Sequence, residues 1–189
     1  MEQNTLSCCF TGYRPHKFPF PFDGGDAQYL EMENRLTDAI FSLPQEGVIR
    51  FYTGAAMGFD LLAAETVLLC RQALGKGAVE LICVIPFPEQ AAAFPEEWKE
   101  RYGRVLTAAD RVITLSDAYA RGCYQRRNEY MVDHSDLVVT WYDGQSGGTR
   151  NTLFYARRQN RRILNLCEKG LNEYSGDGGY TVILEGEAP

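Results

Sequence analysis

The sequence predicts a Rossmann-like α/β fold of three layers, in which helices cover both faces of a mostly parallel central sheet. Short runs rich in β-branched and aromatic residues alternate with longer segments of helical period, as expected for parallel strands joined by crossover helices. In addition, several strands run directly into small residues that open the next helix. Loops of this kind stand at the carboxyl ends of the strands, where α/β proteins bind their ligands.

Six runs have the composition of strands, and the segments between them repeat apolar residues at helical spacing. The expected strands are Leu6–Phe10, Val48–Tyr52, Val79–Ile85, Arg111–Leu115, Leu137–Trp141 and Ile163–Leu166. The first helix carries Met32, Leu36 and Ile40 on one face and ends at Pro44. Further helices are expected at about Asp60–Leu74, around Trp98–Leu106, at Cys123–His134 and at Thr149–Gln159.

Length and composition favour one domain over residues 1–189, because the chain has 189 residues and is 45% hydrophobic. Residues 6–166 form its expected core. Residues 167–189 form a Gly-rich C-terminal extension with an expected edge strand at Tyr180–Leu184. No apolar run reaches the roughly 20 residues of a membrane span, and Met1–Ser7 do not resemble a signal peptide. We expect a cytoplasmic protein without a membrane partner, and homo-oligomerisation is left open.

The net charge bears on nucleic-acid binding, and the cysteines and histidines bear on disulfide and metal sites. A net charge of −6 repels polyanions, so nucleic acid is a disfavoured partner unless a local basic patch exists. The six cysteines form no CxxC pair, and four of them lie inside apolar patterns, which is typical of reduced thiols in a core. Only two histidines are present. We therefore expect neither a metal site nor a cofactor.

Two loops of small residues predict a phosphate site. Thr53-Gly54-Ala55-Ala56-Met57-Gly58 follows the second strand and opens a helix at Asp60, and Ser146-Gly147-Gly148-Thr149 opens the last helix. Small residues let backbone N–H groups approach an anion, which the helix dipole also favours. The alternative is a tight turn with Gly58 at positive φ and with Asp60 or Thr149 capping a helix. Two such loops on one sheet favour phosphate binding by Thr53, Gly54, Ala55, Gly58, Asp60, Gly147, Gly148 and Thr149.

A third loop, Thr11-Gly12-Tyr13-Arg14-Pro15-His16-Lys17, follows the first strand. Thr11 and Gly12 are expected to approach the same ligand, Arg14 to clamp a phosphate and Tyr13 to stack on a base or ribose. The alternative is an exposed loop with solvated charges. The next run, Phe18-Pro19-Phe20-Pro21-Phe22, is expected either to pack as a lid or to form a contact surface.

Two charged residues on helices are candidates for catalysis. Glu65 shares the apolar face of its helix with neighbouring leucines, so it either meets a ligand or is satisfied by an arginine or a backbone N–H. Arg127 lies one helical turn before Met131, which places it near the sheet. There it would receive phosphate or pair with Glu65. We expect Arg127 to reach the loop at 147–149, because its helix leads into the strand that delivers that loop.

Several of these segments together resemble the uncharacterised YpsA-like family. They are TGYRP, TGAAMGFDLLAAE, Pro86-Phe87-Pro88 with Gln90 and Trp98, RNEYMVDHSD and GGT, and the match covers about Cys8 to Leu166. That family belongs to the SLOG superfamily of Rossmann-like folds, whose relatives include the LOG phosphoribohydrolases and the DNA-processing protein DprA. The resemblance implies a nucleotide-derived ligand or DNA.

The LOG enzymes use an Arg four positions before a Met, followed by a PGGxGTxxE segment. Arg127 and Met131 match the first feature, and Gly147, Gly148 and Thr149 resemble part of the second. Thr152 stands where those enzymes carry their catalytic Glu. We therefore expect binding or sensing of a phosphate-bearing, nucleotide-derived ligand, and whether the chain is an enzyme stays open. The alternatives are N-glycosidic hydrolysis, with Glu65 stabilising the developing charge, and DprA-like DNA binding.

Overall fold

The computed structural model describes residues 5–167, 173–175 and 179–181. Six strands form one sheet in which every pair is parallel, in the order β4-β3-β2-β1-β5-β6. Their bounds are β1 Leu6–Thr11, β2 Val48–Thr53, β3 Glu80–Ile85, β4 Arg111–Thr114, β5 Leu137–Thr140 and β6 Arg162–Asn165. The predicted α/β class and the parallel central sheet are confirmed, and each strand begins or ends within one residue of its expected bounds.

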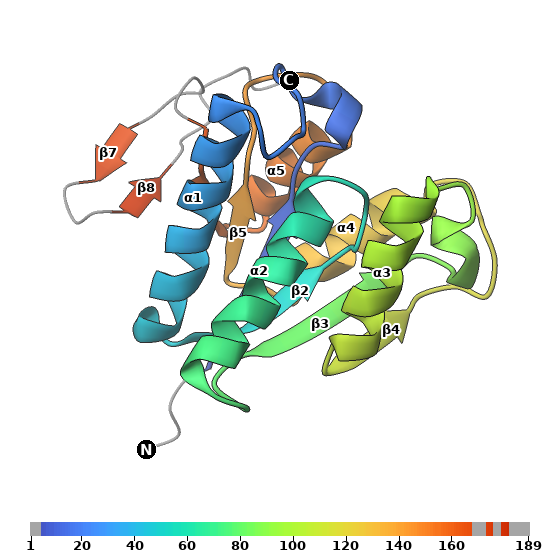
Figure 1. Ribbon diagram of the computed structural model, residues 1–189, viewed down its shortest axis with the longest axis horizontal. Helices are drawn as coiled ribbons and strands as arrows, with labels where there is room; N and C mark the ends of the chain where they lie inside the picture. Colours follow the sequence, from blue (N-terminus) through green and yellow to red (C-terminus); the bar gives the residue numbers. More distant parts are fainter. Residues whose placement is uncertain (1–4, 168–172, 176–178, 182–189) are drawn as a thin grey trace.

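Five α-helices lie in two layers on either side of this sheet (Figure 1). The helices α1 Ala27–Ser42, α2 Phe59–Leu74 and α3 Glu96–Ala108 cover one face, and α4 Cys123–Asp133 and α5 Gly148–Arg158 cover the other. Right-handed crossovers explain this division, because the chain first steps outward from β1 to β4 and then returns to the opposite side of β1. Short 3-10 turns occur at Pro15–Lys17, Leu43–Glu46 and Pro88–Ala91.

The direction of the connections reverses between β1 and β5. The chain leaves β1 toward β2 on one side, and β5 pairs with β1 on the other side. In an open parallel sheet this reversal separates the loops that follow the two strands, and a crevice forms between them at the carboxyl ends. The loops after Thr11 and Thr140 therefore border the crevice of this fold.

The core lies on both faces of the central strands. Cys8, Cys9 and Phe10 of β1 are fully buried, as are Phe51 of β2 and Leu81 of β3, because strands covered by helices on both sides carry continuous apolar runs. The six cysteines are all buried. This agrees with their expected role as core thiols.

The aromatic run after the first loop belongs to the core and is neither a lid nor a free contact surface. Phe18 and Phe20 are buried against Trp141, at ring-centre distances of 5.0 and 5.3 Å. Phe22 packs between Tyr29 and Trp98 of the first helix layer. The run therefore fixes the end of the β1 loop to the segment that follows β5.

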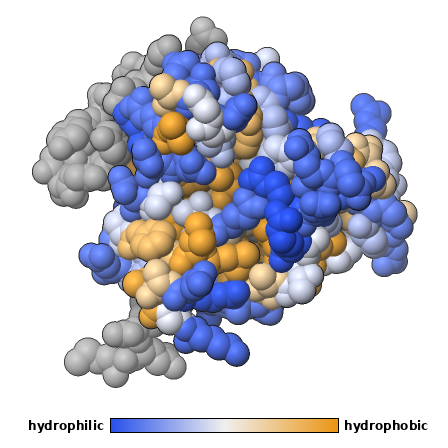
Figure 2. Space-filling view, viewed as in Figure 1, coloured by the Kyte–Doolittle hydropathy of each residue, from blue (hydrophilic) through white to orange (hydrophobic). Residues whose placement is uncertain are grey.

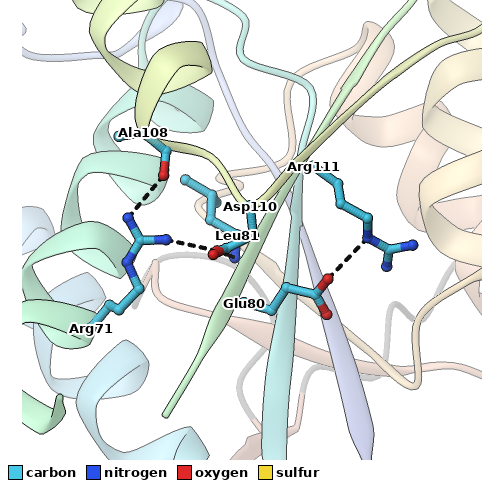
Figure 3. Close-up of polar contacts among 6 residues, drawn as sticks. All are labelled: Arg71, Glu80, Leu81, Ala108, Asp110 and Arg111. Atoms are coloured by element: carbon cyan, nitrogen blue, oxygen red, sulfur yellow. Dashed lines mark hydrogen bonds and ion pairs between the residues drawn. The ribbon is translucent and has the colours of Figure 1, made fainter. Parts of the chain in front are cut away.

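Charged side chains tie the sheet together at its opposite, amino-terminal end (Figure 3). Asp110, just before β4, accepts a bond of 2.7 Å from Arg71 of α2 and one of 2.8 Å from the backbone N–H of Leu81. Beside it, Glu80 accepts a bond of 2.9 Å from Arg111. These charged side chains stabilise the amino-terminal end of the sheet, at the end opposite to the crevice.

The outer face of α1, α2 and α3 mixes hydrophilic and apolar surface (Figure 2), and Leu69 and Leu74 of α2 are among its exposed apolar side chains. No helix in the described part of the chain is long and apolar enough to cross a membrane.

Within the expected edge strand Tyr180–Leu184, residues 182–184 lie outside the described residues. Its first two residues belong to β8 Gly179–Thr181, which pairs antiparallel with β7 Glu173–Ser175 in a separate small sheet and does not extend the main one.

Candidate functional site

A cavity of about 160 Å³ opens at the carboxyl ends of β1 and β5. We call it the crevice. The loop after β1, the start of α2, the start of α4 and the start of α5 all contribute side chains or backbone to its wall. Its lining consists of Thr11, Gly12, Tyr13, Arg14, Lys17, Ala56, Asp60, Tyr124, Arg127, Asn128, Gly147, Gly148 and Thr149.

The wall of the crevice contains a buried pair of opposite charges, Arg127 of α4 and Asp60 of α2. The Arg127 side chain is 4% exposed and donates to the carbonyl oxygen of Gly54 and, at 2.8 Å, to Oδ1 of Asn128. The carboxylate of Asp60 accepts hydrogen bonds from the backbone of Ala56 and Gly54. Asp60 therefore serves the loop before its helix and does not cap the helix, contrary to the alternative expected from the sequence.

Burial sets the protonation behaviour of this pair. It raises the pKa of Asp60 from 3.8 to about 6, although the Arg127 charge and the two backbone hydrogen bonds oppose the rise. Burial also lowers the pKa of Arg127, and the Asp60 charge opposes that shift. The guanidinium still carries its proton at neutral pH, because an arginine starts from a pKa above 12. The pair thus places a fixed positive charge and a titratable carboxyl in one wall.

The backbone approaches Arg127 and Asp60 closely, which explains the glycines of the loop at 53–58. A Cβ at Gly54 would collide with the guanidinium of Arg127 and come within 2.8 Å of Oδ2 of Asp60. Gly58 has a φ of +94°, and a Cβ there would collide with the carbonyl oxygen of Tyr13. The loop at 53–58 is therefore pressed against both Arg127 and the loop after β1, which leaves no room for side chains at these two positions.

The loop after β5 supplies a helix start with free donors. Gly147 is the N-cap of α5, and Gly148 and Thr149 are its first helical residues. The amides of the first turn of a helix have no acceptor within the helix, and a glycine cap supplies none. The Thr149 hydroxyl does not serve as a cap, because it donates to the carbonyl oxygen of Gly12 at 3.0 Å. This bond joins the loops after β1 and β5 across the crevice.

Charge in the lining favours an anion. Arg14, Lys17 and Arg127 are cationic, and among the described lining residues Asp60 is the one carboxylate. Arg14 is exposed at the mouth, while Lys17 donates to the carbonyl oxygen of Ser146 at 3.3 Å. An anion in the crevice would meet three cations and the positive end of α5.

Eight of the twelve expected binding residues line the crevice: Thr11, Gly12, Arg14, Asp60, Arg127, Gly147, Gly148 and Thr149. The other four, Thr53, Gly54, Ala55 and Gly58, lie in the layer behind it. There the Thr53 hydroxyl donates to the carbonyl oxygen of Asp60 and accepts from the N–H of Ala55, which holds Ala55 at a φ of 49°. Arg127 lies on the same crevice as residues 147–149, as expected.

Glu65 is the expected site residue that lies elsewhere. Its carboxylate pairs with Arg101 of α3 through bonds of 2.6 and 2.9 Å, and its side chain is 29% exposed. The interpretation that an arginine satisfies Glu65 is correct. The roles of Glu65 as a partner of Arg127 and as a catalytic group in this crevice are wrong, because Glu65 faces a neighbouring helix and not the strand ends.

Tyr13 also differs from its expected role. The ring is buried, and its hydroxyl donates to Oδ1 of Asp143 at 2.7 Å while it accepts from the N–H of Gln145 at 3.1 Å. Burial and the bond to Asp143 raise the pKa of this hydroxyl. Tyr13 therefore holds the loop after β5 in place and offers no face for stacking.

Four lining residues were not singled out from the sequence: Lys17, Ala56, Tyr124 and Asn128. The signal for Tyr124 and Asn128 was their position, three residues before and one after Arg127, on the first turns of the same helix. Asn128 also donates to the Thr152 hydroxyl at 3.0 Å, and that hydroxyl donates to the carbonyl oxygen of Gly148 at 2.8 Å. Thr152 thus supports the start of α5 by hydrogen bonding.

Comparison with known proteins gives relatives that carry no assigned activity in their names. The uncharacterised SPbeta prophage-derived protein YoqJ of Bacillus subtilis (strain 168) is 32% identical in an alignment of 142 residues that covers 68% of this chain and 82% of that protein. The UPF0398 protein BH1768 of Halalkalibacterium halodurans is 30% identical over 141 residues, covering 74% of this chain and 73% of that protein.

Two solved structures of DNA processing protein A share the fold. The protein from Streptococcus pneumoniae matches with a TM-score of 0.60 and 15% identity, over 93% of this chain and 53% of that one. The protein from Helicobacter pylori, which binds single-stranded DNA, matches with a TM-score of 0.57 and 16% identity, over 84% of this chain and 63% of that one. This chain therefore spans little more than half of each, and the likeness is one of fold.

A family model described as the YspA SLOG family matches residues 8–186. That range contains all the strands of the main sheet except the first two residues of β1, together with the whole lining of the crevice. The chain belongs to the YpsA family of SLOG proteins.

Proposed function

We propose that the crevice binds the phosphate group of a small nucleotide-derived ligand. The observation that carries the proposal is the meeting of the buried guanidinium of Arg127 with the start of α5 in one cavity of about 160 Å³. Backbone amides at a helix start and an arginine both bind phosphate oxygens, and together they neutralise charge from two directions. Arg14 and Lys17 add two cations at the same cavity.

The proposal assigns the residues three tasks. Arg127, Arg14 and the amides of Gly148 and Thr149 bind the phosphate. The carbonyl oxygen of Gly54 holds the Arg127 guanidinium in position, and the nearby Asp60 carboxylate balances its charge. The glycines of the loop at 53–58 allow the backbone to approach the Arg127 guanidinium closely.

We propose binding without hydrolysis of an N-glycosidic bond. Such hydrolysis needs a carboxylate beside the sugar, and the residue at the corresponding place, Thr152, has its hydroxyl bonded to the backbone of Gly148. Glu65 is bonded to Arg101. Asp60 would be the remaining candidate, and its carboxylate is occupied by two backbone N–H groups.

Isothermal titration calorimetry with adenosine 5′-monophosphate, and with adenosine as the ligand without phosphate, tests the proposal. Arg127→Ala should weaken binding of the monophosphate by about 1.5–3 kcal/mol, the scale of a lost charge-assisted hydrogen bond. The matched control is Arg126→Ala, because Arg126 is the exposed neighbour on the same helix, and it should leave the affinity unchanged. Equal affinity for adenosine and its monophosphate, or equal losses in the two variants, would contradict phosphate recognition by Arg127.

Chromatography of the same mixtures tests the absence of hydrolysis. The monophosphate should be recovered intact after prolonged incubation with the protein. Release of free adenine by the wild-type protein, lost in Asp60→Asn, would overturn the non-catalytic proposal and assign the hydrolysis to Asp60.

A further inference from the structure

Three aromatic rings form a row that starts at the mouth of the crevice. Tyr124 of α4 lines the crevice, and Phe87, which follows β3, meets its ring at 5.9 Å between centres. Phe87 also contacts Tyr119, in the loop between β4 and α4, with 5.6 Å between the two ring centres. Both contacts are edge-to-face. We call these residues the aromatic row.

The three rings of the row differ in their exposure to solvent. Phe87 is buried and joins the loops that follow β3 and β4. Tyr119 is 66% exposed, the largest exposed fraction among the large apolar side chains of the described residues. Tyr124 is partly exposed. The row therefore presents aromatic surface to solvent beside a cavity lined by cations.

Two guanidinium groups lie over the inner ring of the row. The Cζ atom of Arg14 is 5.9 Å from the centre of the Tyr124 ring, and that of Arg127 is 6.0 Å away. Arg14 is exposed, so it is free to shift toward or away from the ring. A tyrosine face next to an arginine plane is a pair of surfaces on which nucleobases stack.

The size of the crevice places the rest of the ligand at its mouth. Pockets that enclose a whole drug-sized ligand measure roughly 300–1,000 Å³, whereas this one measures about 160 Å³. It has room for a phosphate with part of a sugar. Any further ring of the ligand must lie toward solvent, against the part of the lining that is exposed, and Tyr124 and Arg14 belong to that part.

We infer that the ring of Tyr124 is the platform on which the base of the ligand stacks, so that the site selects nucleoside phosphates over sugar phosphates and inorganic anions. The inference rests on the proposed phosphate site and adds the residue that recognises the base of its ligand. It also moves the stacking role from Tyr13, which is buried, to a residue on a different helix. The outer ring, Tyr119, extends the same surface.

The test compares two probes by calorimetry, adenosine 5′-monophosphate and ribose 5-phosphate, which differ by the base. The wild-type protein should bind the nucleotide about 5- to 150-fold more tightly, the range expected for one stacked base. Tyr124→Leu should abolish the preference, so that the variant binds the nucleotide and ribose 5-phosphate with equal affinity. Tyr124→Phe keeps the ring and should keep the wild-type preference, which controls for loss of the hydroxyl and for misfolding.

The outcomes separate the two proposals. Equal wild-type affinity for both probes would overturn the stacking platform while leaving phosphate binding intact. A preference for the nucleotide that survives in Tyr124→Leu would also overturn it. Absence of binding to either probe would overturn the phosphate site and the platform with it. Binding of a single-stranded oligonucleotide by a protein that binds neither probe would replace the small ligand with DNA.

Discussion

The buried carboxyl of Asp60 should make the free energy of unfolding depend on pH, because burial raises its pKa. Its pKa in the folded protein is about 6, and in the unfolded chain an aspartate has a pKa of about 3.9. The folded state therefore binds the proton more tightly, and the free energy of unfolding falls as pH rises from about 4 to about 6. Two pKa units correspond to about 3 kcal/mol of stability, which is fully present below about pH 4 and lost above about pH 6.

Asp60→Asn removes this titration and keeps the shape of the side chain. Urea unfolding of both proteins at pH 4 and at pH 7.5 gives the difference in their free energies of unfolding at each pH. The variant should gain about 3 kcal/mol relative to the wild type between the two pH values, because the wild type loses that stability when Asp60 ionises and an amide does not ionise. Asp38→Asn, at an exposed position on α1, is the matched control.

A difference that stays constant with pH would refute this account of Asp60. A difference that changes in the opposite direction would show that the charge of Arg127 outweighs burial and depresses the pKa of Asp60. Either result would require a more open or more polar wall than the one described.

Three further predictions concern the neighbours of this carboxyl. Arg127→Ala should lower the free energy of unfolding at pH 7.5 by about 3–5 kcal/mol in urea titrations, because it leaves a buried carboxylate unpaired, and a loss no larger than that of Arg126→Ala would count against the pair. Gly54→Ala places a methyl group where the guanidinium lies and should reduce ribose 5-phosphate affinity in calorimetry at least tenfold, and unchanged affinity would disprove the close approach. Glu65→Gln breaks an ion pair outside the crevice and should leave that affinity within a factor of two, so a large loss would return Glu65 to the site.

The fold could be predicted from the sequence because each of its elements has a local signal. The strands are continuous apolar runs, as in β1, where Cys8, Cys9 and Phe10 are buried on both faces. The glycines after the strands mark backbone approach, and Gly54 and Gly58 are both positions where a Cβ would collide. The ends of the elements differ by a residue, as at Thr11 and Thr53, because pairing of the last residue depends on the neighbouring strand.

The site was predicted less completely, because helical spacing does not tell which neighbour a face meets. Glu65 and Arg127 both share a face with apolar residues, yet Glu65 meets Arg101 of α3 while Arg127 meets the strand ends. The burial of Tyr13 depends on Asp143 and Gln145, about 130 residues away in the chain. Such contacts between distant loops leave no trace in the local pattern.

Titration of the isotope-labelled protein with ribose 5-phosphate, followed by amide resonances in ¹H–¹⁵N spectra, tests the central claim most directly. Binding in the crevice should move the resonances of Gly12, Gly148 and Thr149 and the Nε–H resonance of Arg127, all saturating with one dissociation constant. The amides of the opposite, amino-terminal end of the sheet, such as Leu81, should not move. Saturating shifts that spare the start of α5, or that gather around Leu81 instead, would contradict a phosphate site at the carboxyl ends of β1 and β5.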